Sequence, residues 1–187
     1  MSEGTIGART WLVLFARMPA EPARHRMALW RELRRAGAVP LGQGAWAVPD
    51  LPAVQPLLMR LSRLAAAGNG QLLMLSARGR GAGDVERLEQ LYIEAREQDW
   101  TEFRADCAKY FTELDKEEAT GKYTLAELEE EEQSLDRLRR WYRDLRARDL
   151  LASPPAADAA ADLKTCEQRF DTYAEHVYTA VGSRPQD

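Results

Sequence analysis

The sequence predicts an α+β protein in which a small antiparallel sheet is followed by an all-helical part. Three observations support this class. Short apolar strands alternate with helical periodicity over roughly the first 80 residues, helical periodicity alone follows, and the sign of the charge reverses between the two parts. The 187 residues suffice for one large domain or two small ones. We expect a basic sheet domain over residues 1–82 and an acidic helical domain over residues 83–187.

The first half of the chain contains three segments with clear strand or helix signals. Residues 11–18 are apolar at nearly every position, which predicts a central strand covered on both faces. A helix should follow over residues 22–36, because Pro22 suits a first helical turn and Gly37 suits the residue after the last. Residues 38–41 and 45–48 flank a glycine-rich turn and predict a hairpin. Pro40 cannot donate to a ladder, so the first hairpin strand should lie at an edge.

A second helix and a fourth strand complete the sheet domain. Residues 51–67 carry leucines at spacings typical of a helix, and residues 71–77 form an apolar strand. The order β-α-β-β-α-β is the ferredoxin-like pattern, which places the first strand in the centre and the second at an edge. Both placements agree with the apolar first strand and with Pro40.

The remainder of the chain indicates helices. An aromatic and apolar stripe runs through a helix of about thirty residues, and Thr124 with Glu127 predicts a capping box for the next helix. A last helix should span about residues 156–181. Three antiparallel helices with short turns would bury their stripes together, so we expect a three-helix part with aromatic residues in its core. The glutamates at 129–132 are interpreted as a solvated face.

The net charge of −4 conceals opposite charges in the two parts. Residues 1–82 contain eleven arginines, no lysine and four acids, whereas the rest contains 15 basic and 26 acidic residues. This asymmetry favours a basic working surface joined to an acidic helical part. The helix at 22–36 carries Arg24, Arg31 and Arg35 on one face, opposite Leu29 and Leu33.

Arg26 and Trp30 lie one turn apart on the apolar arc of that helix. We therefore expect Trp30 in the core. An arginine on this arc needs a carboxylate, an aromatic face or a backbone carbonyl as its partner. Alternatively, its stem is buried and its head group reaches water.

Signatures of catalysis, metal binding or a cofactor are missing from the sequence. Cys107 and Cys166 form no CxxC motif and are predicted to be reduced, structural thiols. His25 and His176 belong to no ligand or nucleophile pattern. Arg17 stands where a metal-dependent nuclease of this topology would need an aspartate. We expect no enzyme, no metal and no cofactor.

Neither a membrane segment nor a secretion signal is visible. No apolar run approaches the ~20 residues of a membrane span, and the N-terminus has no basic-then-apolar pattern. The expected location is the cytoplasm, without contact to a membrane.

Residues 78–83, with the sequence Arg78-Gly-Arg80-Gly-Ala-Gly, allow two interpretations. Their N–H groups and arginines could approach an anion just before a helix begins. The spacing matches neither a dinucleotide fingerprint nor a Walker loop, so a flexible inter-domain linker is favoured.

Several stretches resemble the N-terminal half of ChrB, the bacterial chromate-resistance regulator: residues 11–15, Arg26-Met-Ala-Leu-Trp-Arg31, Leu33, Gly37-Ala38 and residues 44–49. The resemblance runs through both parts of the chain, and ChrB in turn resembles the ferredoxin-like middle domain of PaaX-type repressors. It implies a cytoplasmic, chromate-responsive transcription regulator whose N-terminal half contacts DNA through basic residues. With other arginines of the basic part, the candidate DNA-binding residues are Arg17, Arg24, Arg26, Arg31, Arg34, Arg35, Arg78 and Arg80.

The sequence departs from longer ChrB proteins, which continue into a second half implicated in chromate sensing. It also shows no helix-turn-helix signature. We therefore expect a module that binds the promoter DNA of its operon, with a homodimer or a separate chromate-sensing protein as a possible partner. The alternative is a non-enzymatic adaptor of the chromate-resistance system that acts through its helical part.

Overall fold

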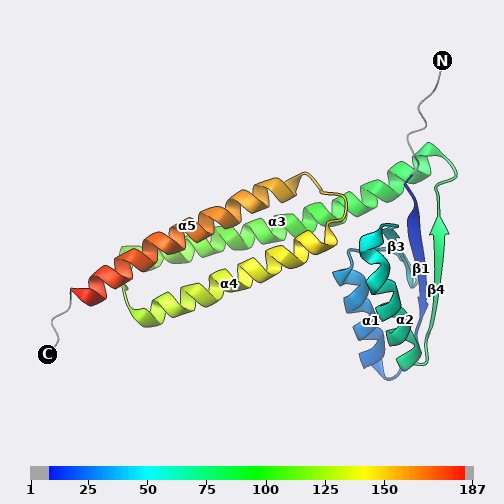
Figure 1. Cartoon of the computed structure of the whole chain (residues 1–187), viewed down its shortest axis with the longest axis horizontal. Coiled ribbons are helices and arrows are strands. Elements are labelled where there is room, and N and C mark those ends of the chain that lie inside the picture. The colour runs from blue at the N-terminus through cyan, green and yellow to red at the C-terminus, as the bar shows by residue number, and fades with distance from the viewer. Residues whose placement is uncertain (1–8, 184–187) are drawn as a thin grey trace, which may run out of the picture. The chain divides into compact units, whose positions relative to one another are not determined.

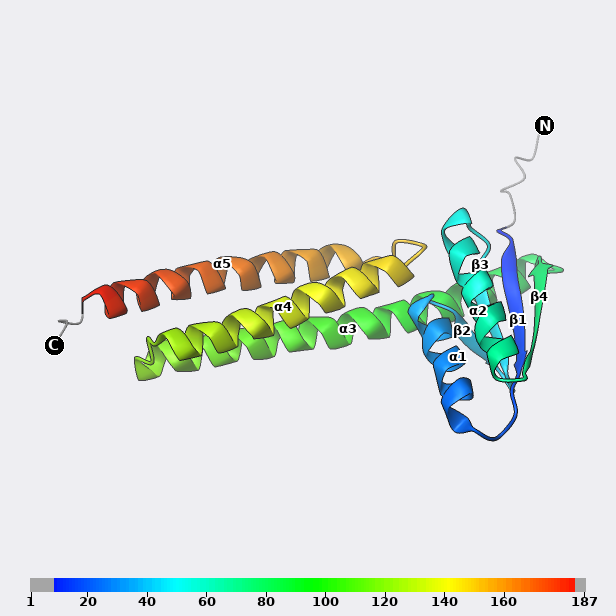
Figure 2. The same cartoon turned by 60° about the horizontal axis from the view of Figure 1, so that its bottom comes forward.

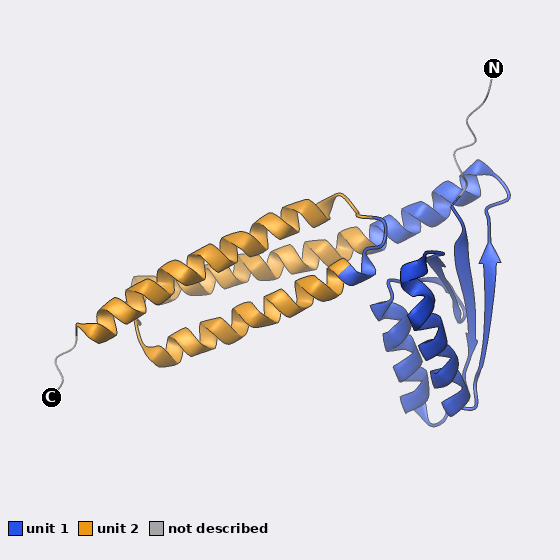
Figure 3. Ribbon diagram, in the orientation of Figure 1, with its two compact units in different colours: residues 1–95, 147–151 blue, residues 96–146, 152–187 orange. Residues whose placement is uncertain are grey.

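The computed structural model describes residues 9–183. Its contacts divide the chain into two compact units, shown in different colours in Figure 3. The sheet unit comprises the chain up to residue 95 together with residues 147–151, and the helical unit comprises residues 96–146 and those from 152 onward. The division falls inside one long helix, α3 (Ala82–Thr120), and not where the composition changes.

The sheet unit has the predicted ferredoxin-like order of elements (Figure 1). All strand pairs are antiparallel and the sheet order is β2-β3-β1-β4, so the first strand is central and the strand containing Pro40 lies at an edge, as predicted. The elements are β1 (Trp11–Arg17), α1 (Ala23–Arg35), β2 (Val39–Gly42), β3 (Ala45–Pro49), the 3-10 helix η1 (Pro52–Val54), α2 (Gln55–Ala67) and β4 (Gln71–Ala77).

Helices α1 and α2 cover the same face of the sheet (Figures 1 and 2). Leu12 and Leu14 of β1 point into this layer because alternate residues of a strand share a face. Leu29 and Leu33 of α1 and Leu61 of α2 meet them, and all five side chains are buried. The helical spacing of the leucines therefore places α1 and α2 on the sheet, as expected from the sequence.

Two expectations about burial are wrong. Trp30 remains 43% exposed, because Leu29 and Leu33 make the contact between α1 and the sheet. Phe15 is 44% exposed, and its neighbours on β4, Leu73 and Leu75, are also exposed. The face of β1 opposite to the helices is therefore covered only in part.

Tyr92 of α3 covers one end of the sheet face that is opposite to α1 and α2. Its ring packs edge-on against Trp11, with 5.9 Å between the ring centroids, and both side chains are fully buried. The Tyr92 hydroxyl donates to the carbonyl of Arg148 at 2.6 Å and accepts from the N–H of Leu150 at 3.0 Å. These bonds fasten residues 147–151 to the sheet unit.

The helical unit contains the rest of α3 with α4 (Leu125–Arg148) and α5 (Pro155–Gly182), which run side by side (Figures 1 and 2). The predicted stripes form one core that includes Trp100, Phe103 and Tyr173, which are all fully buried. The hydroxyl of Thr124 accepts a hydrogen bond from the N–H of Glu127 at 3.2 Å, which confirms the Thr124 half of the predicted capping box. The carboxylate of Glu127 pairs with Lys122 at 3.5 Å. Within residues 9–183, no helix combines the length and the apolar character that crossing a membrane requires.

Cys107 and Cys166 come together in this core, although they are far apart in the sequence. Both are free thiols and both are buried. A hydrogen bond between their side chains, together with burial, raises the pKa of Cys107 well above its usual range. Their role in the fold is packing.

The interpretation of residues 129–132 as a solvated face is wrong at one position. Glu129, Glu130 and Glu132 are exposed, whereas Glu131 is only 8% exposed because it faces the interior side of α4. Burial raises the pKa of Glu131 to about 7, and the negative charges of neighbouring glutamates add to this effect.

The contrast between Leu33 and Trp30 can be tested by truncation. We expect Leu33→Ala to lower the free energy of unfolding by about 2–5 kcal/mol, because it leaves a cavity in the sheet unit's core. Trp30→Ala should cost about 1 kcal/mol or less, because the residue is 43% exposed and lies outside the core. Urea unfolding followed by circular dichroism measures both, and equal losses would contradict this description of α1.

The buried carboxyl of Glu131 should make stability depend on pH. Its folded pKa of about 7 exceeds the unfolded value, so the folded state binds the proton more tightly and stability falls as pH rises through this range. Relative to Glu131→Gln, the wild type should lose up to about 3 kcal/mol between about pH 5 and pH 8. Urea unfolding at several pH values checks this. Glu129→Gln, an exposed control, should follow the wild-type profile.

Candidate nucleic-acid interface

The helical layer on the sheet is strongly basic. Helices α1 and α2 together carry seven arginines and a single acid, Glu32. One carboxylate oxygen of Glu32 pairs with Arg35 and the other with Arg60, each at 3.1 Å. Within these two helices, arginines therefore outnumber acids by seven to one.

The predicted stripe of Arg24, Arg31 and Arg35 lies on the exposed side of α1, opposite the buried Leu29 and Leu33. Arg24 is exposed, and its Nε donates to Nε2 of the neighbouring His25 at 3.3 Å. These side chains are therefore available to a partner without disturbing the core.

Arg34 and Arg26 both lie next to exposed Trp30. The guanidinium carbon of Arg34 lies 5.5 Å from the centre of the indole ring, within the range of a cation–π contact. Arg26 is exposed and donates from Nη1 to the carbonyl of Ala20 at 3.3 Å. The partner of Arg26 is thus a backbone carbonyl, which is one of the three kinds of partner expected from the sequence.

A hollow of about 430 Å³ separates α1 from the end of β1 and the turn between β2 and β3. Arg17 and Arg26 contribute its charged groups, and the indoles of Trp30 and Trp46 contribute aromatic walls. Gly44 is needed in the turn, because its φ is +81° and a Cβ there would come within 2.7 Å of the Ala16 carbonyl oxygen.

Sequence reasoning missed the two tryptophans and Gln43 as residues of this hollow. The available signal was the spacing of Arg26 and Trp30, which places them on one helix face. The same spacing predicts a core position for Trp30, because a helical wheel does not distinguish a buried face from the rim of a hollow.

Arg78 and Arg80 do not join the other candidate arginines. They follow Ala77, which pairs with Trp11, whereas Arg17 pairs with Gln71 at the opposite end of the sheet. The eight predicted arginines therefore lie in at least two separate places.

The segment between β4 and α3 is short, and it uses one of its N–H groups internally. The Gly81 N–H donates to the carboxylate of Asp84 at 3.1 Å. A carboxylate of the chain itself thus occupies the helix N-terminus at which an anion would bind.

The layer on α1 and α2 has the chemistry of a polyanion-binding surface. Guanidinium groups bind phosphate oxygens through charge-assisted, often bidentate hydrogen bonds. The exposed indole of Trp30 beside them offers a face for stacking with bases. The fold and this surface define a class of protein: a ferredoxin-like unit with a basic, aromatic-lined helical layer, joined to an acidic three-helix unit.

Comparison with known proteins identifies the family. The family described as "Protein ChrB, N-terminal" matches residues 26–184, so the chain belongs to the ChrB family, in agreement with the resemblance seen in the sequence. Protein ChrB of Cupriavidus metallidurans is 30% identical over 98 residues. This match covers 52% of the present chain but only 30% of that relative. Of the candidate arginines, Arg17 and Arg24 precede the family match.

The glycine at the hollow gives a test of this geometry. Gly44→Ala should destabilise the sheet unit by about 1–3 kcal/mol, because the new methyl group meets the Ala16 carbonyl at a positive φ. Gly83→Ala, in the first turn of α3 with open space around it, is the control and should be neutral or slightly stabilising. Urea unfolding compares the two, and an unaffected Gly44→Ala would contradict the described turn.

Proposed function

We propose that this chain is the DNA-binding module of a chromate-resistance regulator, that it is not an enzyme, and that it acts in the cytoplasm. It would bind the promoter of its own operon through the arginines of α1, with Arg17 and Arg26 extending the contact at the hollow. Membership of the ChrB family supports a regulatory role in chromate resistance.

The observation that carries the proposal is the charge of the helical layer, with seven arginines against one acid. Arg24, Arg31 and Arg35 are exposed opposite a well-packed core, so their guanidinium groups can meet a row of phosphates. The chain has an overall charge of −4, so a generally basic protein does not explain this local excess. The acidic helical unit would be repelled by the duplex, which favours an approach through the basic layer.

A second candidate is an adaptor that acts through its helical unit, with a second copy or a separate chromate-sensing protein as its partner. It is favoured by the buried, unpaired Glu131, because a structural bundle gains nothing from an isolated carboxylate in its interior. In this function the arginines of α1 would be no more than a solvated face.

The two candidates differ in the salt dependence of DNA binding. Each phosphate contact that is lost should reduce the slope of log affinity against log salt concentration by about 0.9. The triple variant Arg24→Gln, Arg31→Gln, Arg35→Gln should therefore flatten the slope by up to about 2.7. Fluorescence anisotropy with a promoter duplex at several salt concentrations measures the change.

A matched control removes the same charge from the helical unit. Arg140→Gln, Arg143→Gln, Arg146→Gln replaces three exposed arginines of α4 and should leave the slope unchanged. Both triple variants should keep wild-type melting temperatures, because exposed substitutions change stability by about 0.5 kcal/mol or less. If the α1 variant binds with wild-type affinity and slope, α1 is not the DNA surface and the adaptor function gains support.

A further inference from the structure

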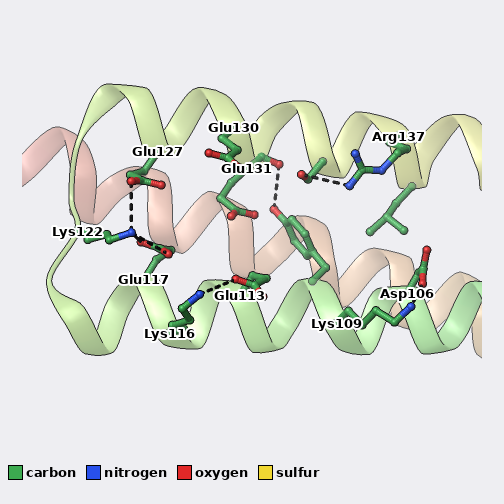
Figure 4. Close-up of a pocket in the computed structure, with 13 residues that line it drawn as sticks. Asp106, Lys109, Glu113, Lys116, Glu117, Lys122, Glu127, Glu130, Glu131 and Arg137 are labelled. Atoms are coloured by element: carbon green, nitrogen blue, oxygen red, sulfur yellow. Dashed lines mark hydrogen bonds and ion pairs between the residues drawn. The ribbon is translucent and has the colours of Figure 1, made fainter.

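A groove with a volume of about 440 Å³ lies between α3 and α4 in the helical unit, far along the sequence from the basic layer (Figure 4). Its charged side chains comprise six acids and four bases, so it is negative overall. The size is within the range of small-molecule sites. The charged lining residues are Asp106, Lys109, Glu113, Lys116, Glu117, Lys122, Glu127, Glu130, Glu131 and Arg137.

One end of the groove already holds an ammonium group of the chain itself. The Nζ of Lys122 lies 3.2 Å from a carboxylate oxygen of Glu117 on α3 and 3.5 Å from one of Glu127 on α4. Glu117 is only 5% exposed, so this ammonium compensates a buried charge and bridges the two helices. The contact shows which chemical group the walls of the groove accept.

The next pair of carboxylates along the groove has no such bridge. Glu113 lies one turn before Glu117 on α3, and Glu131 lies one turn after Glu127 on α4. Because the two helices are antiparallel, Glu113 and Glu131 form the next pair along the groove. Figure 4 shows Glu131 pointing from α4 toward α3, on the side where Glu113 lies. Lys116 pairs with Glu113 at 3.3 Å, but through exposed side chains at the rim.

Glu131 is the unusual member of this second pair. It is 8% exposed, and among residues 9–183 no side chain donates a hydrogen bond or forms an ion pair to its carboxylate. A buried carboxylate without a partner is costly, and a cation placed beside it would offset that cost. The geometry therefore points to a ligand that brings a positive charge to Glu131.

The charged and apolar residues that line the groove indicate which class of ligand fits it. An oxyanion would meet six acids against four bases, so the net negative charge of the groove disfavours it. A divalent metal needs several converging oxygen ligands, and within residues 9–183 no group of three or more His, Cys, Asp or Glu could hold one. An alkylammonium needs only one or two carboxylates and an apolar surface for its stem, which Leu138 and the ring of Tyr110 provide.

We propose that the groove between α3 and α4 binds a short aliphatic diamine or polyamine. One ammonium lies between Glu131 and Glu113, as that of Lys122 lies between Glu117 and Glu127. A second ammonium reaches the carboxylate of Glu130, which lines the same groove and is exposed at its rim. This site does not depend on the proposed DNA-binding function.

Binding should be linked to the protonation of Glu131. Because the pKa of Glu131 is raised to about 7, an ammonium that requires its ionised form must displace a proton below that pH. Affinity should therefore fall by up to about tenfold per pH unit as the pH decreases below 7. The groups that face or electrostatically influence Glu131 are Tyr110, Glu113 and Glu117 of α3, Glu127 and Glu130 of α4, Lys122, and Tyr173 of α5.

The test is isothermal titration calorimetry of the full chain with 1,4-diaminobutane and with spermidine at about pH 8 and low salt. We expect one site per chain, and Glu131→Gln should weaken binding at least about tenfold. Glu129→Gln removes the same charge from the exposed side of α4 and should bind as the wild type does. Circular dichroism of both variants establishes that they are folded.

Several results would overturn the proposal. Absence of binding to the wild type would do so directly. Equal weakening in Glu129→Gln and Glu131→Gln would show diffuse attraction to an acidic helix. Displacement of the diamine by Mg²⁺ at equal concentration would show a metal site. Binding that is lost only in Glu131→Gln, and that weakens below about pH 7, supports the proposal.

Discussion

A single buried tyrosine holds together the parts of the sheet unit that are most distant in sequence. Tyr92 packs its ring on Trp11 of the central strand, and its hydroxyl satisfies the carbonyl of Arg148 and the N–H of Leu150. A buried hydroxyl with both its donor and its acceptor function used is worth far more than an unpaired one. These contacts attach residues 147–151 to the sheet unit, whose other residues are continuous in sequence up to residue 95.

The two candidate sites carry opposite excesses of charge. On the sheet unit, Glu32 is the single acid of α1 and α2, and its two oxygens hold Arg35 and Arg60 at 3.1 Å. In the helical unit, Lys122 compensates Glu117 and Glu127, but Glu131 is left alone. A protein interior rarely retains such a group without a use, because the desolvation of a carboxylate is costly. The two candidate sites thus arise from opposite electrostatic situations, an excess of arginines at a surface and an unpaired acid in a groove.

The order and type of the elements could be predicted from local patterns. Alternation and apolar runs identified β1 to β4, Pro40 marked the edge strand, and Thr124 marked the start of α4. The candidate interface was predictable only in part. The exposed stripe of α1 followed from the helical wheel, but the hollow that joins Arg17 and Arg26 to the two tryptophans depends on the β2–β3 turn. No periodicity within one helix reports how closely a separate turn approaches it.

The sequence by itself determined the α+β class, the ferredoxin-like order and the separation of basic from acidic residues, because each depends on neighbours within a few positions. The tertiary structure alone decided which apolar and charged residues are covered. Trp30 and Phe15 stay partly exposed, Cys107 meets Cys166, and Glu131 is buried between helices. These outcomes depend on which surfaces meet after folding, and contacts between residues distant in the chain leave no local signal.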